Sequence, residues 1–168
     1  MDQILLVDGY NIIGAWPELI QLKEKNLDDA RDRLLEILSE YQAYTGAKVI
    51  VAFDAHQVSG LGSKERYASL TVAYTRENET ADECIERLAG QLKTKRNQVV
   101  VATSDYTEQR VIFAQGALRK SARELLLEWQ ELKRQIKGQV QQESTKKPSN
   151  SIPLDENLKK LFEEWRRQ

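Results

Sequence analysis

The sequence predicts an α/β fold with a central, mostly parallel sheet, and three observations carry this prediction. Four short apolar runs have the length of buried strands. Segments with apolar residues at helical spacing alternate with these runs, as expected when helices connect parallel strands. Acidic residues follow the runs, so a parallel sheet would gather them at the carboxyl edge, where ligands bind. The apolar runs are residues 3–8, 48–53, 70–75 and 98–103.

The helices are predicted from apolar periodicity and from end signals. In the first long helical segment the apolar residues recur at helical spacing, and Gly46 is expected to end it. Thr80 and Glu83 have the spacing of a capping box at the start of the next helix. A long helix with a single apolar stripe follows the last strand. The predicted helices span about residues 26–44, 81–94, 106–115 and 121–142.

The C-terminal part of the chain predicts an appendage to a single domain. Residues 1–142 form the predicted main domain, which is consistent with a chain of 168 residues. Residues 143–153 are polar and contain two prolines, which indicates a linker. Residues 154–168 predict an amphipathic helical extension, and we expect its apolar face to dock on the body. We expect a monomer.

Charge is unevenly distributed along the chain. Residues 1–109 contain 12 Lys and Arg against 18 Asp and Glu, whereas residues 110–168 contain 13 against 8. An acidic body joined to a basic C-terminal region suggests a metal site in the first and a polyanion contact in the second. Solvated helix faces explain the same distribution equally well, so charge alone leaves both interpretations open.

The single cysteine, Cys84, excludes an intramolecular disulfide and fits a reducing compartment. We expect it to be a small buried helix residue, and His56 to be a loop residue outside the site. The apolar run at the N-terminus is too short for a signal peptide, and no stretch has the length of a membrane span. These features predict a cytoplasmic protein without membrane contact.

Acidic residues at the predicted strand ends are the candidate active site. Asp8, Asp54 and Asp105 follow three of the strands, and Asp82 lies in the first turn of the helix after a fourth. Asp82 precedes Ile85 by three residues, which places it on the inward stripe of its helix, where a charge needs a partner. Clustered carboxylates repel one another and raise one another's pKa unless a cation lies among them. Mg²⁺ prefers such oxygen ligands.

Each acid also has a structural explanation. Asp82 would complement the positive end of its helix. Asp105 would cap the following helix, with Glu108 completing a capping box. Asp8 and Asn11 would be ordinary turn residues. The coincidence of several acids at one predicted edge favours the metal site over these separate explanations.

Other chemistries fit the sequence less well. Tyr10 stands where a haloacid-dehalogenase-type phosphatase has its second Asp, and Gly9 stands where a receiver domain has an acidic pair. The sequence contains neither a Walker phosphate-binding loop nor a dinucleotide fingerprint. A Ser-His-Asp hydrolase would depend on His56, and no Gly-x-Ser-x-Gly elbow is present.

Four motifs together resemble the NYN branch of the PIN-like nucleases, and a fifth segment resembles its YacP-like bacterial subfamily. Their order, their spacing and the length of the chain are similar to those of the YacP-like bacterial subfamily, over nearly the whole sequence. The set is more specific than any of its members. The motifs are Asp8-Gly9-Tyr10-Asn11, Phe53-Asp54-Ala55, Glu79-Thr80-Ala81-Asp82, Thr103-Ser104-Asp105 and residues 115–125.

This resemblance implies a three-layer PIN-like fold and a Mg²⁺- or Mn²⁺-dependent endoribonuclease. Asp8, Asp82 and Asp105 match the acidic positions of the family and would hold the metal, and Asn11 matches its motif asparagine. The chain is similar to a ribosome-associated endonuclease of Gram-positive bacteria that cuts messenger RNA in the ribosomal A site. The resemblance therefore also implies a ribosome partner.

We expect a metal-activated water to attack the phosphodiester, with Asn11 orienting a water or a phosphate. Asp54, Glu79 and Ser104 are supporting candidates. The basic side chains are expected to bind RNA phosphates, and Tyr10 and Tyr106 to stack on bases, although partial core packing explains the tyrosines equally well. The basic candidates are Arg119, Lys120, Arg123, Lys133, Arg134 and Lys137.

Two alternatives remain open at this point. The first is a non-catalytic RNA- or ribosome-binding module with the same fold, in which substitution of Asp82 would change little. The second is a small-molecule phosphohydrolase that uses the same metal cleft. The basic C-terminal region argues mildly against the second alternative.

Overall fold

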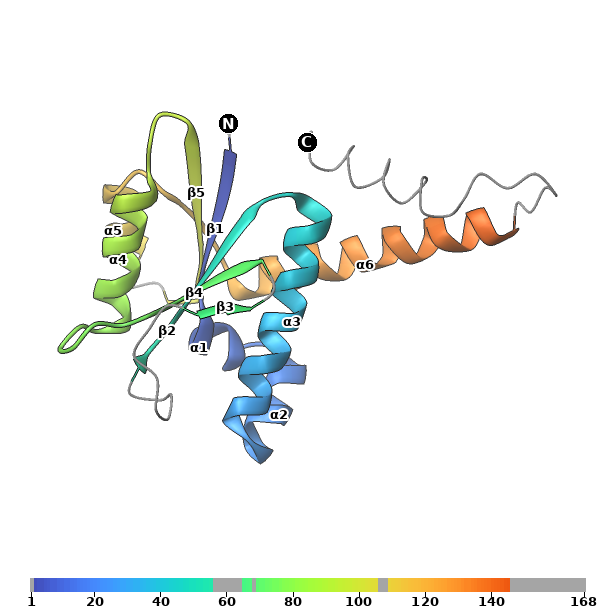
Figure 1. The fold of residues 1–168 in the computed structure, drawn as a ribbon, viewed down its shortest axis with the longest axis horizontal. Helices are drawn as coiled ribbons and strands as arrows, with labels where there is room; N and C mark the ends of the chain where they lie inside the picture. The colour runs from blue at the N-terminus through green and yellow to red at the C-terminus, as the bar shows by residue number, and fades with distance from the viewer. Residues whose placement is uncertain (1, 56–64, 68, 106–108, 146–168) are drawn as a thin grey trace.

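The computed structural model describes residues 2–55, 65–67, 69–105 and 109–145, and Figure 1 shows the arrangement of its elements. The strands of the described part are β1 (Asp2–Asp8), β2 (Lys48–Phe53), β3 (Glu65–Tyr67), β4 (Leu70–Tyr74), β5 (Asn97–Ala102) and β6 (Leu118–Lys120). The helices of the same part are α1 (Gly9–Ile13), α2 (Pro17–Lys25), α3 (Leu27–Thr45), α4 (Ala81–Leu92), α5 (Gln109–Ala114) and α6 (Ala122–Thr145).

The sheet has the order β3-β4-β2-β1-β5-β6. Every neighbouring pair is parallel except β3 with β4, so the predicted mostly parallel α/β sheet is confirmed. All four predicted strands are present. β1 lies in the interior of the sheet between β2 and β5, as expected for the strand that ends at Asp8.

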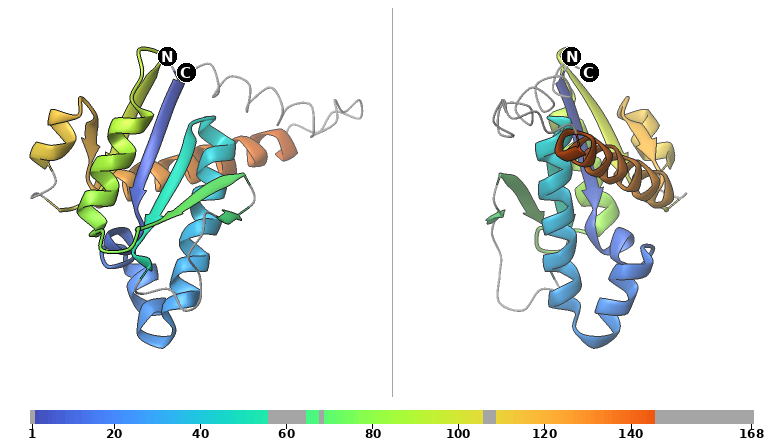
Figure 2. Two further views of the ribbon diagram at one scale, coloured as in Figure 1. Left: turned by 60° about the vertical axis from the view of Figure 1, so that its left-hand side comes forward. Right: turned by 90° about the vertical axis from the view of Figure 1, so that its right-hand side faces the viewer.

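Helices cover both faces of the sheet and make a three-layer fold. Figure 2 shows α4 and α5 on the opposite side of the sheet from α2 and α3. Alternate residues of β1 separate accordingly: Leu5 and Val7 pack in the core beneath α1 and α3, and Ile4 and Leu6 pack against α4. This alternation explains why β1 is apolar without interruption from Ile4 to Val7, since neither face of this stretch meets water.

The ends of the long helices follow the sequence signals. The side chain of Asn26 accepts a hydrogen bond from the Asp28 N–H (2.8 Å), and α3 ends at Gly46, whose φ of 74° suits glycine. Thr80 Oγ1 accepts the Glu83 N–H (3.1 Å), which confirms Thr80 as the N-cap of α4.

α6 crosses the body and then extends well beyond the sheet (Figure 1). Its first half packs on α1 and α3: Trp129 is buried and stacks on Tyr44, with ring centroids 6.0 Å apart. The Trp16 indole N–H donates to the Ala122 carbonyl (2.8 Å), which anchors the start of α6 to the loop before α2. The predicted apolar stripe therefore docks through its N-terminal half.

The sequence did not predict β3, β6 or the separate helices α1 and α2. β3 and β6 have three residues each and α1 has five, so none is long enough to show a period. α6 runs to Thr145, three residues past the predicted linker boundary. The predicted C-terminal helix and most of that linker lie outside the described residues. None of the described helices is both long and apolar enough to cross a membrane.

Candidate active site

The predicted strand-end acids lie at one edge of the sheet. Asp8 is the last residue of β1, Asp54 directly follows β2, and Asp105 lies three residues past β5. Because β2, β1 and β5 are parallel neighbours, with Asp8 paired to Ala52 and Val7 to Ala102, these ends point the same way. The topology therefore places at one edge of the sheet three acids that are far apart in sequence.

Asp8 is the centre of this group. Its side chain is buried, with a residue exposure of 9%, and its Oδ2 accepts a hydrogen bond from the Thr103 hydroxyl (3.3 Å). The pKa of Asp8 is raised from 3.8 to about 6. Burial is the largest cause and the charges of Asp82 and Asp105 add to it, while hydrogen bonds from the Thr103 hydroxyl and the Asn11 backbone N–H oppose the rise. Asp82 and Asp105 therefore both act on the carboxylate of Asp8.

The loop after β5 is held against the start of α1. The Ser104 N–H donates to Asn11 Oδ1 (2.7 Å), and the Asp105 N–H donates to Thr103 Oγ1 (3.1 Å). Asn11 thus fixes the loop that carries Asp105, a role that the sequence did not suggest. Thr103 was also missed as a site residue, and the only signal for it was a hydroxyl at the end of the strand before Ser104.

Asp82 lies in the first turn of α4 and is exposed, which corrects the expectation of an inward-facing charge. Ile85 and Ala89, on the same stripe, are buried as predicted. The buried residues of α4 begin at Cys84, so its first residues are not covered although they continue the same stripe. Asp82 still influences the pKa of Asp8 from this exposed position.

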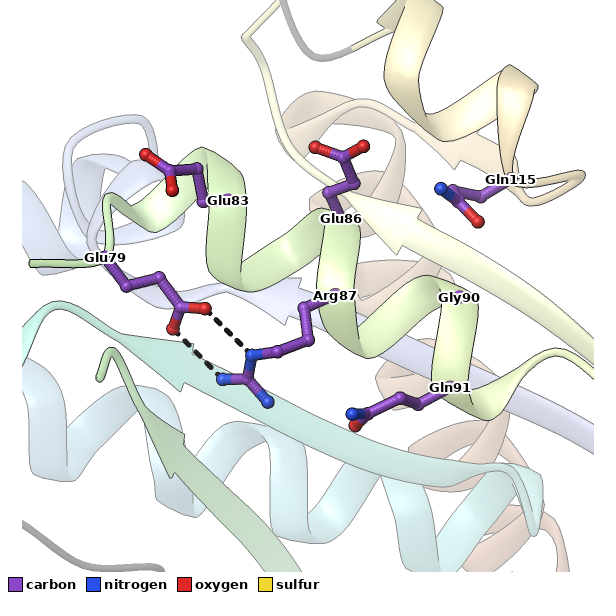
Figure 3. A pocket seen from close by; sticks show the side chains of 7 residues that line it. All are labelled: Glu79, Glu83, Glu86, Arg87, Gly90, Gln91 and Gln115. Atoms are coloured by element: carbon purple, nitrogen blue, oxygen red, sulfur yellow. Dashed lines mark hydrogen bonds and ion pairs between the residues drawn. The ribbon is translucent and has the colours of Figure 1, made fainter. Parts of the chain in front are cut away.

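Glu79 forms an ion pair with Arg87 of α4. Glu79 accepts two hydrogen bonds from the Arg87 guanidinium (2.8 and 3.0 Å) and one from the Arg76 N–H (3.0 Å), and Arg87 holds the pKa of Glu79 down at about 2. Figure 3 shows this pair in a shallow pocket along α4. The described residues that line the pocket are Glu79, Glu83, Glu86, Arg87, Gly90, Gln91 and Gln115.

Tyr10 packs into the structure beside the acids. Its ring meets Phe53 edge-on at 5.0 Å, and burial raises the pKa of its hydroxyl, to which the nearby charge of Asp54 also contributes. Asp54 is partly exposed at the same edge. Tyr10 is thus partly packed into the core, as its alternative explanation expected, while its stacking on a base remains a prediction. Tyr106, Glu108 and His56 lie outside the described residues.

The approach of α1 to β2 depends on Gly9. A Cβ at this position would lie 2.3 Å from Phe53 Cε1 and 3.0 Å from the Ala52 carbonyl oxygen. Since real Cβ atoms do not approach so closely, only glycine allows the chain to turn here directly after Asp8.

The acids have the right chemistry for a divalent cation, although they do not form a complete protein cage. Within the described ranges, no three His, Cys, Asp or Glu side chains come together closely enough to hold a metal. Mg²⁺, however, usually binds through one or two carboxylates and keeps several waters. A buried carboxylate, Asp8, with Asp82 and Asp105 acting on it, fits that mode of binding.

The basic candidates divide into two groups. Arg119 and Lys120 lie on β6, and the Lys120 ammonium pairs with Glu128, which also accepts a hydrogen bond from the Tyr41 hydroxyl. The second group lies along α6, and the Lys133 ammonium sits 5.6 Å from the Trp129 ring centroid. This group comprises Arg123, Lys133, Arg134 and Lys137.

Cys84 lies on the inward face of α4 and is fully buried, as expected. Burial raises the pKa of its thiol to about 11, so the thiol stays protonated at neutral pH. Its burial and its raised pKa both argue against a nucleophilic role.

The sheet order, the covering helices and the acids at the carboxyl edge define a PIN-like α/β protein. The chain belongs to the YacP-like NYN domain family, whose model matches residues 5–167. It is 55% identical over 164 residues to the protein YacP of Bacillus subtilis (strain 168), covering 98% of this chain and 96% of YacP.

Two crystal structures of Rae1 (YacP) from Bacillus subtilis are similar. One is of a tryptophan-to-leucine mutant, which is 52% identical with a TM-score of 0.78, covering 98% of this chain and 95% of the mutant chain. A second Rae1 structure is 55% identical with a TM-score of 0.75, covering 99% and 95% respectively. Membership of this family supports a nuclease or another RNA-related function.

Proposed function

We propose that this protein is a Mg²⁺- or Mn²⁺-dependent endoribonuclease that cleaves messenger RNA. The observation that carries the proposal is the buried carboxylate of Asp8, whose pKa is raised to about 6 by burial and by Asp82 and Asp105. Placing this charge near other acids costs stability unless a cation compensates it. In a metal-dependent nuclease, such clustered carboxylates bind the cation that the reaction requires.

Asp8, Asp82 and Asp105 would hold the cation, with waters completing its shell. When bound, it would lower the pKa of a water and offset charge on the phosphodiester. Asn11 and Thr103 keep the loop of Asp105 in place against Asp8. Attack by water on phosphorus with departure of the 3′-oxygen leaves 5′-phosphate and 3′-hydroxyl ends.

The basic face of α6 is the proposed RNA-binding surface. Lys133, Arg134 and Lys137 line one shallow hollow together with Gln130. Ammonium and guanidinium groups at a surface bind phosphates without reading sequence. Lys120 is already paired with Glu128, so it contributes less to this surface than its sequence position suggested.

The ribosome is the proposed partner, and the cytoplasm the proposed location. The ribosome is proposed from the resemblance to a ribosome-associated endonuclease, and the cytoplasm from the single cysteine and the short apolar run at the N-terminus. A phosphate-binding helix face without base contacts would leave the choice of cleavage site to such a partner.

The test is cleavage of an end-labelled messenger RNA with Mg²⁺, both free and under translation. Wild type is compared with Asp82→Asn and with Glu86→Gln, a matched neutralisation one turn further along α4. We expect wild type and Glu86→Gln to cut and Asp82→Asn to bind RNA without cutting it. Cutting confined to translated RNA would support the ribosome as a required partner. RNA binding without cutting by wild type would favour the non-catalytic binding module.

A further inference from the structure

We propose that Thr103 is a positioning residue whose single hydroxyl fixes the carboxylate of Asp8 relative to the backbone of Asp105. This inference rests on the proposed nuclease function. It assigns a role to a side chain that is neither a ligand candidate nor part of the charged cluster.

The Thr103 hydroxyl lies between the two acids. The hydroxyl donates to Asp8 Oδ2 at 3.3 Å, and the same oxygen accepts the Asp105 N–H at 3.1 Å. A hydroxyl has one hydrogen to donate and lone pairs to accept with, so both bonds form at once. The end of β1 and the loop after β5 are thereby joined through one atom.

The position of Thr103 is itself fixed by the sheet. Its residue exposure is 0%, and its backbone N–H donates to the Lys120 carbonyl of β6 (3.0 Å). The hydroxyl therefore belongs to a rigid strand end rather than to the loop that it holds. Asn11 holds the same loop from the α1 side through the Ser104 N–H. Both contacts hold the loop that carries Asp105.

A second buried threonine offers a matched comparison. Thr75 follows β4 at the same edge, has a residue exposure of 7%, and accepts the Ala55 N–H through Oγ1 (2.9 Å). It resembles Thr103 in burial and in capturing a backbone N–H, but the bond described for its hydroxyl goes to a main-chain group and not to an acid. Removing each hydroxyl separates a structural role from a positioning role.

The experiment compares Thr103→Val, Thr103→Ser and Thr75→Val with wild type and Asp8→Asn. Single-turnover RNA cleavage, KM, melting temperature and Mn²⁺ binding measured by electron paramagnetic resonance are recorded for each. We expect Thr103→Val to lower the cleavage rate and the Mn²⁺ affinity by about 10–100-fold, the usual effect of losing a group that orients a ligand. KM should change little, and Thr103→Ser should restore both quantities. Thr75→Val should affect melting temperature only.

Thr103→Cys provides a second comparison should Thr103→Val fail to fold, because Cys matches Ser in size but is a weak donor. A cleavage rate and Mn²⁺ affinity for Thr103→Val or Thr103→Cys equal to those of Thr103→Ser would overturn the positioning role. The proposed function fails separately, if Asp8→Asn cleaves RNA as fast as wild type. If Asp8→Asn is inactive while Thr103→Val is fully active, the proposed nuclease function is supported and only the positioning role of Thr103 is refuted.

Discussion

At the scale of single residues, the site is organised around the charge of Asp8. Its position could be predicted because it ends a buried strand, and the carboxyl ends of parallel strands lie at the edge of the sheet where ligands bind. The contacts of Thr103 and Asn11 could not be predicted, because each joins residues more than 90 positions apart. The exposure of Asp82 was also mispredicted. Periodicity shows which face of a helix points inward, but not how far along the helix that face stays buried.

Asp8→Asn should stabilise the metal-free protein at high pH. The pKa of Asp8 is raised from 3.8 to about 6 in the folded state, so the folded state binds the proton of Asp8 more tightly than the unfolded state does. The resulting contribution to the free energy of unfolding is fully present below pH 3.8 and is lost as pH rises through about 6. We expect a gain in unfolding free energy of about 1–3 kcal/mol at pH 8, vanishing near pH 3.5. Urea unfolding at both pH values measures it. The exposed Asp32→Asn serves as control, and a less stable Asp8→Asn at pH 8 would refute the argument.

At the scale of elements, the parallel strands and long helices were predictable from periodicity and capping, and the short elements were not. α1 is the most consequential of those missed, because it carries Asn11 and begins directly after Asp8. Its place depends on a close approach to Phe53 that glycine alone permits. Such an approach leaves no mark in the periodicity of the sequence.

Gly9→Ala should destabilise the fold by about 1–3 kcal/mol, the usual cost of overpacking. The new Cβ would clash with Phe53 and with the Ala52 carbonyl. Gly138→Ala in α6 is the matched control, because a Cβ there meets nothing within 4 Å, and it should stabilise by about 0.5–1 kcal/mol. Thermal unfolding of both variants is the measurement. Equal effects at the two positions would show that the approach of α1 is not tight.

Arg87→Gln should loosen the loop that leads into α4. Arg87 lowers the pKa of Glu79 from 4.5 to about 2, so this pair stabilises the fold above pH 4.5 and less as pH falls toward 2. We expect a loss of about 1–3 kcal/mol at pH 7 that shrinks below pH 4. Arg134→Gln, which breaks the exposed pair with Glu131, should cost less than about 0.5 kcal/mol. A loss that is independent of pH would contradict this assignment.

At the scale of the whole molecule, the charge asymmetry read from the sequence becomes a spatial one. Asp8, Asp54 and Asp105 lie at the carboxyl edge of the sheet, while Lys133, Arg134 and Lys137 lie on α6, a helix that projects beyond the sheet (Figure 1). Composition predicted the sign of each part. The pairing of Lys120 with Glu128 and of Arg134 with Glu131 depends on packing that composition does not encode.

Neutralising the α6 face should weaken RNA binding and its dependence on salt. For Lys133→Gln/Arg134→Gln/Lys137→Gln we expect the salt slope to become shallower by about 0.7 for each phosphate that is no longer neutralised. The matched control is Lys48→Gln/Lys95→Gln/Arg96→Gln, which removes the same charges from exposed positions at the opposite edge of the sheet. Fluorescence anisotropy with labelled RNA at several salt concentrations measures both. Identical slopes for the two triple variants would exclude α6 as the binding face.

The central claim is that Asp8, Asp82 and Asp105 act together as a cation-dependent RNA-cleaving site. The most direct measurement is the single-turnover cleavage rate at fixed Mg²⁺ for Asp8→Asn, Asp82→Asn and Asp105→Asn, alone and combined. Residues that act as one unit are non-additive, so each single variant should lose about as much rate as the triple variant. Rates near that of wild type for the single variants, or losses that simply multiply in the triple variant, would contradict it.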